Sequence, residues 1–367
     1  MTMENKKITR DYGLDIVRII SMLGIVILHI NGAGGVLSCC QNQHTVGSYW
    51  TAFWVEILAY TSVDIFGLMS GYLGIYKKKT SCVRILELIC IVFFYCVCIT
   101  VVFKIAFPEM VIGIKGLLKG VFPQIVGRYW YITCYIPIGI FQPYINKAIL
   151  SLSEKEHLRL SILIIAVFGL LQSFVIVDLF TFKQGYSFVW LLCLYIVGAY
   201  IKRVDLFKSA NKIKQKSMAI LLAGSVVLLV GNIFVDFVIH KNISYFVSYI
   251  SPIILLMSIC IIFLFRNMEI KSFSKIIATL SMVTFDVYLL HCHILIYDNF
   301  ITDHFCWIAD MNIAVIPFVI VACGIVILLV ASIIGVVRSY IFKITKLNNL
   351  IKKVSVKLDK LLYVTGE

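Results

Sequence analysis

The stretch GLDIVRIISMLGIVILHI, residues 13–30, decides the fold of this chain. Apart from Asp15, Arg18 and His29 it is almost wholly apolar, and it has about the length that an α-helix needs to cross the hydrocarbon core of a bilayer. The polar residues 1–10 lead into it without a small-residue cleavage site. We therefore expect this segment to be kept as a membrane helix and not removed as a signal peptide.

Apolar segments of this kind follow one another along the 367 residues. The chain is 61% hydrophobic and 14% charged, whereas soluble domains have about 25% charged residues, so a water-soluble fold is excluded. The segments that are long enough to span are 14–31, 51–73, 84–107, 129–149, 159–179, 186–201, 217–238, 244–265, 273–297 and 312–342. They predict an all-α polytopic membrane helix bundle of about ten transmembrane helices.

Two further regions differ from these segments. Residues 108–128 contain glycines and two prolines and are too short to span, so a re-entrant or interfacial element is predicted there. The membrane domain is predicted to cover residues 1–345. Residues 346–367 form a basic tail with leucines at helical spacing, which predicts an amphipathic helix on anionic lipid.

The basic residues alternate from loop to loop. Of the 33 Lys and Arg residues, 26 fall in one set of alternate loops, namely 1–10, 74–84, 147–159, 202–216, 266–275 and the tail from 338. Short cytoplasmic loops collect Lys and Arg during insertion, so both termini are predicted to be cytoplasmic. The 298–310 loop, with three aspartates, is predicted to lie outside. The net charge of +14 therefore reflects topology, and no nucleic acid partner is expected.

The 12 cysteines mostly lie inside apolar runs, where a thiol behaves as a small hydrophobic group. Their spacing does not match a zinc-binding pattern, so no metal is expected. Cys39, Cys40 and Cys306 fall near the predicted outer face. Free thiols and a bridge are both open for these three, and free thiols are the expectation.

Ionisable groups inside the membrane are candidates for function because burying them is costly. They are Asp15, Arg18, His29, Asp64, Glu87, Asp286, His291 and His293. From Arg18 to His29 is eleven residues, or three helical turns plus about 20°, so both side chains share one face about 16 Å apart. Asp15 lies on the same stripe. The alternative is that Arg18 and His29 only extend to the inner and outer headgroups.

A second polar stripe follows one face of the 273–297 segment. It consists of Ser281, Thr284, Tyr288 and His291. It is either hydrogen-bonding contact between helices or, if it faces the first stripe, part of a site. Asp64 lies on one face with Gly67 and Gly71, whose small size permits close helix approach.

These residue types suit acyl transfer. A histidine in a partly apolar pocket can take a proton from an alcohol near neutral pH. Fixed cations on the cytoplasmic side suit the phosphates of acyl-CoA.

Five segments in order resemble the integral-membrane acyltransferase family 3, whose members modify surface glycans, lipids and small molecules. They are GLDIVRIISMLGIVILHI (13–30), VDIFGLMSGYLG (63–74), RYWYITCYIPIGIFQPYIN (128–146), YSFVWLLCLYIVGAYIKR (186–203) and FDVYLLH (285–291). The first carries the signature arginine and histidine at Arg18 and His29. The resemblance covers nearly the whole chain, and the third and fourth segments resemble glycan-acetylating members in bacteria.

The resemblance implies an acyl-CoA co-substrate, usually acetyl-CoA, with no permanently bound cofactor. The acceptor would be a hydroxyl of a surface or lipid-linked saccharide outside the bacterial cytoplasmic membrane. The resemblance also implies that His29 is essential and that Arg18 serves donor binding or channel structure. We therefore predict His29 as the catalytic base with His291 and Tyr288 as helpers, and Arg18, Lys77, Lys78, Lys79 and Arg84 as donor-binding residues. The implied structural or orienting residues are Asp15, Asp64, Ser70, Gly71 and Trp130.

The chain departs from the family pattern in three ways. The 77–84 loop has lysines where many members have paired arginines. Asp286 stands where a small uncharged residue is common, and there is no fused outer hydrolase-like domain. The alternative function is a transporter or exporter of a small molecule or glycan precursor, which the lack of internal repeats disfavours. A membrane sensor using the tail is a third reading, and the oligomeric state, homodimer included, stays open.

Overall fold

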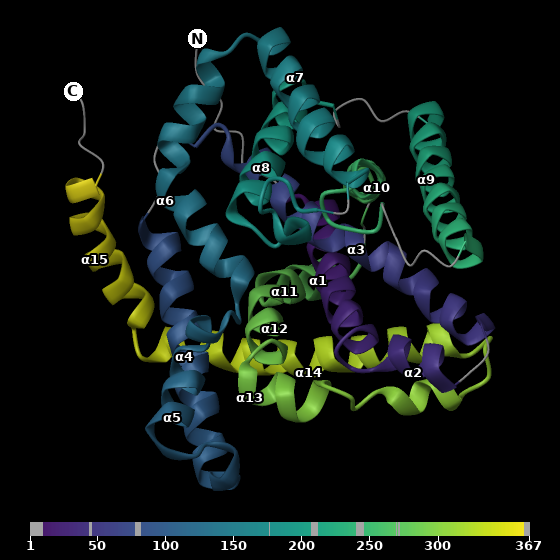
Figure 1. Ribbon diagram of the computed structural model, residues 1–367. Helices are drawn as coiled ribbons and strands as arrows, with labels where there is room; N and C mark the ends of the chain where they lie inside the picture. Colours follow the sequence, from purple (N-terminus) through teal and green to yellow (C-terminus); the bar gives the residue numbers. More distant parts are fainter. Residues whose placement is uncertain are drawn as a thin grey trace.

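The computed structural model describes residues 10–43, 46–77, 82–175, 177–206, 212–239, 246–268, 270 and 272–362. Helix is the only regular secondary structure among these residues, and they contain no strand (Figure 1). Within the described residues, each of the ten predicted segments overlaps at least one helix. The helices concerned are α1 (Tyr12–Asn31), α3 (Val46–Gly74), α4 (Cys82–Ala106), α6 (Trp130–Ser151), α7 (Glu154–Leu163), α8 (Phe188–Arg203), α9 (Lys212–Ile239), α10 (Pro252–Arg266), α11 (Ser274–Met282), α12 (Thr284–His291) and α14 (Ile316–Ile344).

Five stretches within the described residues are long and apolar enough to cross a membrane. They are Tyr12–Asn42, Gly47–Gly74, Cys82–Ala106, Lys212–Val235 and Ile316–Ile344. Other predicted spans are divided: α7 continues into a π-helical stretch, η3 (Ile164–Leu171), and the 273–297 segment is split into α11, α12 and α13 (Ile294–Ile296). The chain is therefore a multi-pass helical protein, while the count of ten and the orientation of the termini remain predictions.

Helix α1 lies at the centre of the bundle and packs against α3, α10, α11, α12 and α14. Helix α3 also packs closely on α8. A Cβ atom added to Gly71 would meet the carbonyl oxygen of Tyr195, and one added to Gly198 would meet the carbonyl oxygen of Leu68. These glycines let the two backbones touch, as expected for small residues between membrane helices.

The 108–128 region forms short elements: η1 (Pro108–Met110), α5 (Gly113–Val121) and η2 (Pro123–Val126). None of them has the length to span a membrane. Helix α5 packs against α4, and the region ends at Arg128, whose guanidinium pairs with Asp298 at 2.5 Å. The end of the predicted re-entrant or interfacial region therefore lies beside the start of the 298–310 loop, which is predicted to be outside.

The expectation of free outer cysteines is wrong for two of the three. Cys39 on α2 (Val36–Gln43) and Cys306 on η6 (Cys306–Asp310) form a disulfide. The connection after α1 lies alongside the 298–310 loop, because the N–H groups of Asp303 and Phe305 donate to Ala33 and Gly34 carbonyls. This contact, between residues far apart in sequence, brings the two thiols together.

The tail forms an amphipathic helix, α15 (Leu347–Leu362), which packs against α4. The carboxylate of Asp359 accepts a hydrogen bond from the Cys82 N–H at the start of α4. Ile351 is buried, while Leu350 and Val354 are exposed. The side of α15 that carries Ile351 thus packs on protein. The side that carries Leu350 and Val354 is exposed and suits the lipid contact that the sequence predicts.

Candidate active site

His29 and His291 form a hydrogen-bonded pair between the last turn of α1 and the last turn of α12. The His29 Nδ1 and His291 Nε2 atoms are 3.0 Å apart, and His291 Nδ1 lies 2.6 Å from the Val287 carbonyl oxygen. A carbonyl only accepts, so His291 carries its proton on Nδ1 and offers a lone pair on Nε2. His29 then donates from Nδ1. This arrangement leaves the lone pair of His29 Nε2 free to act as a base.

The two predicted polar stripes face each other at two depths. At the outer depth they meet through the two histidines. At the inner depth the Ser281 hydroxyl donates to the Asp15 carboxylate at 2.8 Å. These contacts confirm that the polar stripe of α1 faces the polar stripe of the 273–297 segment. This was the condition under which the sequence analysis expected the two stripes to form a site.

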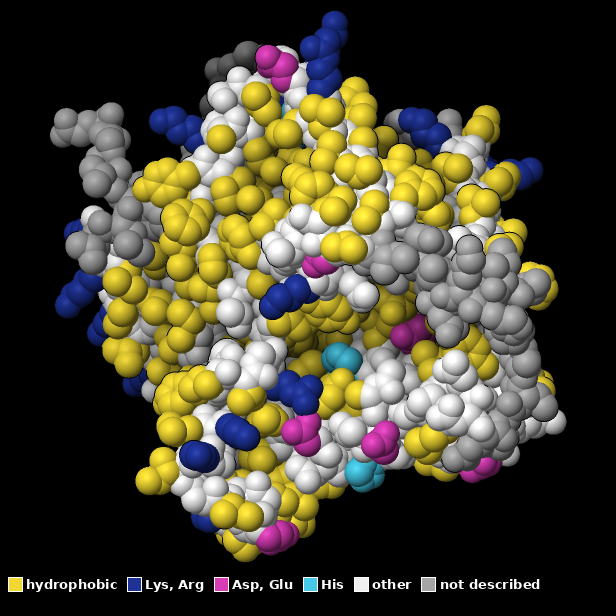
Figure 2. Space-filling view, viewed as in Figure 1, with side chains coloured by type: hydrophobic (Ala, Val, Ile, Leu, Met, Phe, Trp, Pro, Cys, Tyr) yellow, Lys and Arg dark blue, Asp and Glu magenta, His cyan; other side chains and the backbone are white. Residues whose placement is uncertain are grey.

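The surroundings of His29 make it the more accessible of the pair. His29 is half-buried, whereas His291 is only 2% exposed. The ring of Tyr297 meets His29 edge-on, with centroids 5.2 Å apart, and the Arg128 guanidinium lies 4.2 Å above the Tyr297 ring. Figure 2 shows a hollow in one face of the molecule, with a histidine and an acidic side chain visible inside it and basic side chains at its rim.

Cys292 adds a thiol to this pair. Its Sγ lies 3.4 Å from His291 Nε2 and 3.8 Å from His29 Nδ1. The three ligand atoms are all within 4.8 Å of one another and can hold a metal ion, since imidazole and thiolate are zinc ligands. Cysteine spacing did not predict this cluster, because its members come from α1 and from the end of α12.

Tyr288, a predicted catalytic helper, belongs to an aromatic layer. Its ring centroid lies 6.4 Å from that of His291, 5.7 Å from that of Tyr129 and 6.5 Å from that of Tyr131. The residue is buried, and within the described part of the chain its hydroxyl bonds to neither histidine. The structure therefore places it behind the pair, where it packs.

The predicted donor side is a cluster of cations at the other end of α1. Asp15 accepts hydrogen bonds from Arg10 at 2.5 Å and from Arg18 at 3.0 Å. The Arg18 side chain keeps 34% of its surface exposed. Because α1 is continuous between them, Arg18 and His29 lie about 16 Å apart along one helix.

Lys77 and Arg84 extend this cluster. The protein around Lys77 removes part of its water shell, and together with the charges of Arg84 and Arg18 this lowers the pKa of Lys77 below its ordinary value. Mutual repulsion of this kind is relieved by a bound anion. Lys78 and Lys79 lie outside the described residues.

The predicted orienting residues mainly join helices. Trp190 on α8 donates to the Asp64 carboxylate at 3.2 Å, and the Ser70 hydroxyl donates to the Gly67 carbonyl at 2.6 Å. Trp130 begins α6 and contacts the ring of Tyr186, with centroids 4.9 Å apart. These contacts fix α3, α6 and α8 and do not include the histidines.

Asp286 is explained by residues that the sequence analysis did not connect. The Arg338 guanidinium donates to both carboxylate oxygens, at 2.7 and 2.8 Å, and the Tyr95 hydroxyl donates at 2.7 Å. The sequence analysis counted Arg338 with the cytoplasmic tail, which is wrong: it is buried in α14. Both residues stand in mainly apolar segments, but their positions in the sequence do not show that they pair.

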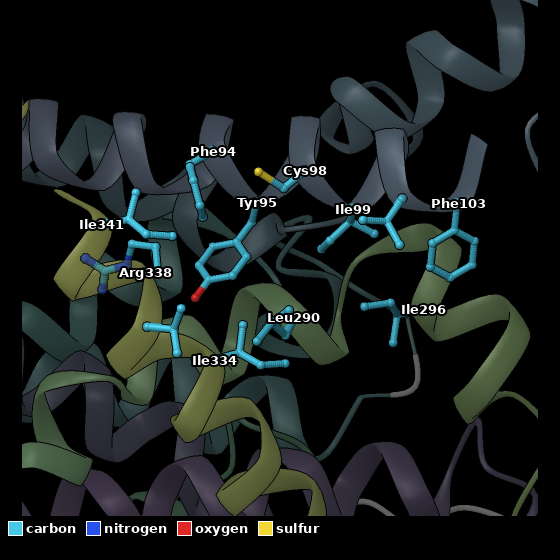
Figure 3. A pocket seen from close by; sticks show the side chains of 12 residues that line it. Phe94, Tyr95, Cys98, Ile99, Phe103, Leu290, Ile296, Ile334, Arg338 and Ile341 are labelled. Carbon is cyan, nitrogen blue, oxygen red and sulfur yellow. The ribbon is translucent and has the colours of Figure 1, made fainter. Parts of the chain in front are cut away.

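Tyr95 and Arg338 also line a crevice of about 280 Å³ between α4 and α14 (Figure 3). Its other lining residues are almost all apolar, and neither histidine reaches it.

Residues 11–337 match the family model described as "Acyltransferase domain". The match includes Arg18, His29 and His291, and it confirms the resemblance seen in the sequence; it lends no support to a transporter. No curated protein and no solved structure matches the chain. Nearly the whole chain is covered by the family model, so this multi-pass membrane protein belongs to the acyltransferase family 3.

Proposed function

We propose that this protein is an O-acyltransferase that moves an acetyl group from cytoplasmic acetyl-CoA to a hydroxyl of a cell-surface or lipid-linked glycan. One observation carries the proposal. The hydrogen-bond chain from His29 through His291 to the Val287 carbonyl leaves a basic nitrogen on His29, in a protein of an acyltransferase family.

The proposed step is direct transfer. His29 Nε2 accepts the proton of the acceptor hydroxyl while the oxygen of that hydroxyl attacks the carbonyl carbon of the thioester. The C–O bond forms, the C–S bond breaks, and the CoA sulfur leaves with the proton from His29. The His291 lone pair holds the His29 N–H and stabilises the imidazolium that forms on His29. A positioned general base contributes about 10²- to 10⁴-fold in rate.

The donor site follows from the position of the cations. Arg18, Lys77 and Arg84 would hold the phosphates of CoA, and α1 leads from there to His29. An extended donor placed along α1 would bring its thioester toward the histidine, about three helical turns from Arg18. This placement connects a cytoplasmic donor to an acceptor on the other side.

The test is transfer by purified protein in lipid nanodiscs. Labelled acetyl-CoA is mixed with envelope polysaccharide from the producing cells after its O-acetyl groups have been removed with mild alkali. We expect label in the polysaccharide with wild type and with Glu154→Gln, a control at the exposed start of α7, and none with His29→Gln. Equal labelling by His29→Gln would contradict the proposal.

The same question can be asked in cells. Mass spectrometry of the surface glycans should show the loss of an acetyl-sized mass when the gene is deleted, and its return with the wild-type gene. Unchanged glycans, together with accumulation of a precursor inside the cell, would indicate export instead.

A further inference from the structure

Glu56 is a buried carboxyl group that the candidate list from the sequence did not contain. It lies on α3 and is 5% exposed. Among the described residues its Oε2 atom has no hydrogen-bond partner. Asn31 lies against it, and the Asn31 Oδ1 atom is also without a partner in that part of the chain. Two buried acceptor oxygens without donors are costly unless a ligand supplies the donors.

Glu56 lies at the same depth as His29. The Asn31 amide donates to the Ala52 carbonyl at 3.3 Å, and further along the same helix pair Gly24 lies against the side chain of Ser62. Helices α1 and α3 are therefore antiparallel, and position 29 of α1 stands beside positions of about 54–57 on α3. A group held by Glu56 is at the right depth to meet the base.

A row of aromatic rings leads from Glu56 to the surface. Tyr60 contacts Tyr249 at 5.4 Å between centroids, Tyr249 contacts Tyr186 at 5.0 Å, and Tyr186 contacts Trp130 at 4.9 Å. The Tyr186 and Tyr249 hydroxyls are 3.4 Å apart. Tyr186 is 44% exposed and Tyr249 only 4%, so the row leads from an open ring at Tyr186 to a buried one at Tyr249.

This row lies within electrostatic reach of the histidine site. The Tyr60, Tyr186 and Tyr249 hydroxyls are within electrostatic reach of Glu56. Tyr186 is also within electrostatic reach of Tyr297, whose ring contacts His29.

We propose that Glu56 and Asn31, with the ring wall of Tyr60, Tyr249 and Tyr186, form the saccharide subsite for the acceptor. The inference rests on the proposed function. Saccharides present hydroxyl donors at the rim of each ring and apolar C–H groups on its faces. The two free oxygens would accept from hydroxyls next to the one that reacts. The exposed Tyr186 ring would pack against a sugar face.

Binding is tested separately from transfer. Calorimetry with fragments of the de-O-acetylated envelope polysaccharide is carried out on purified protein without acetyl-CoA. We expect Glu56→Gln and Glu56→Ala to weaken binding by about tenfold, the effect of losing a buried hydrogen bond. Tyr186→Ala should weaken it and Tyr186→Phe should retain it. Wild-type affinity in Glu56→Ala would overturn the subsite.

Kinetics separate the subsite from the base. With Glu56→Gln the acceptor KM should rise while the acetyl-CoA KM and the slow hydrolysis of acetyl-CoA by water stay at wild-type values; His29→Gln should abolish hydrolysis. If Glu56 were only structural, Glu56→Gln would lower the unfolding temperature and would change the kinetic parameters for donor and acceptor together. That result would refute a binding role. If the polysaccharide bound and binding required Glu56, but wild type transferred no acetyl group, the proposed function would be wrong and the subsite would stand.

Discussion

His29 Nδ1 and His291 Nε2 lie 3.0 Å apart although 262 positions separate the two residues. The Val287 carbonyl fixes the proton of His291, and His291 in turn fixes the proton of His29. The base and the residue that orients it therefore come from different helices. Any change that moves α12 relative to α1 therefore alters the orientation of His29 and the position of its proton, even when His29 itself is not substituted.

His291→Ala should lower the transfer rate by about tenfold to a hundredfold, less than the loss of a general base. The reason is that His29 keeps its ring but loses the partner that fixes its tautomer. His291→Gln, whose side-chain oxygen can accept from His29, should recover part of the rate. Initial-rate assays at saturating acetyl-CoA measure this. If His291→Ala lost all activity while His29→Ala kept it, the base would be His291.

Arg18→Ala and Arg84→Ala should each weaken acetyl-CoA binding by about tenfold while leaving the unfolding temperature near that of wild type. Each removes one charge-assisted contact with phosphate. Salt should reproduce part of the effect because the cluster is open to solvent. Calorimetry with CoA is the measurement, and Lys343→Ala, in the last turn of α14, is the matched control. Unchanged CoA affinity in both variants would remove the donor site from this end of α1.

Lys77 gives the donor site a pH dependence. Its pKa lies below the ordinary lysine value in the free protein, so it loses its proton as pH rises before an isolated lysine would. CoA affinity should therefore fall with rising pH before an ordinary lysine would lose its proton, and Lys77→Met should flatten that part of the curve. An identical curve for the variant would exclude Lys77 from the site.

Arg338→Ala should destabilise the protein by about 3–5 kcal/mol, because it leaves the Asp286 carboxylate buried without its partner. The double variant Asp286→Leu/Arg338→Met should recover much of this loss, since it removes both charges. Thermal unfolding in detergent compares them. A single variant as stable as wild type would mean that the pair does not hold α12 to α14.

The disulfide offers a test of both stability and orientation. Cys39→Ser should lower the free energy of unfolding by about 2–5 kcal/mol. Reduction of the disulfide should lower the free energy of unfolding of the wild-type protein by a similar amount. After reduction, an impermeant maleimide added to intact cells should label Cys306, but not a cysteine introduced in 202–216. Tags on both termini should report the cytoplasm. Labelling of 202–216 from outside would reverse the topology and the placement of His29.

Local patterns in the sequence predicted most of the helices and part of the site. Apolar runs identified the long helices but not α2, and helical spacing placed Arg18 and His29 on one face. The pairing of His29 with His291 needed the added assumption that their stripes face each other. That assumption is confirmed by a contact which no local pattern encodes.

The remaining features depend on contacts between distant segments. The Asp286–Arg338 pair and the disulfide join helices far apart in the chain, and sequence spacing is silent on both. Glu56 is different. A glutamate within the apolar 51–73 segment was a visible signal, since an acidic group inside a membrane helix marks a functional candidate. The structure shows its relation to His29, which depends on the antiparallel alignment of α1 and α3.

The most direct test of the account is His29→Gln, measured in parallel for acetyl-CoA binding, membrane insertion and transfer to de-O-acetylated polysaccharide. We expect CoA affinity and insertion to match wild type, and transfer to fall by at least about 10²-fold, because a general base is lost while the donor cations about 16 Å away are untouched. Transfer at the wild-type rate would contradict the assignment of His29 as the base.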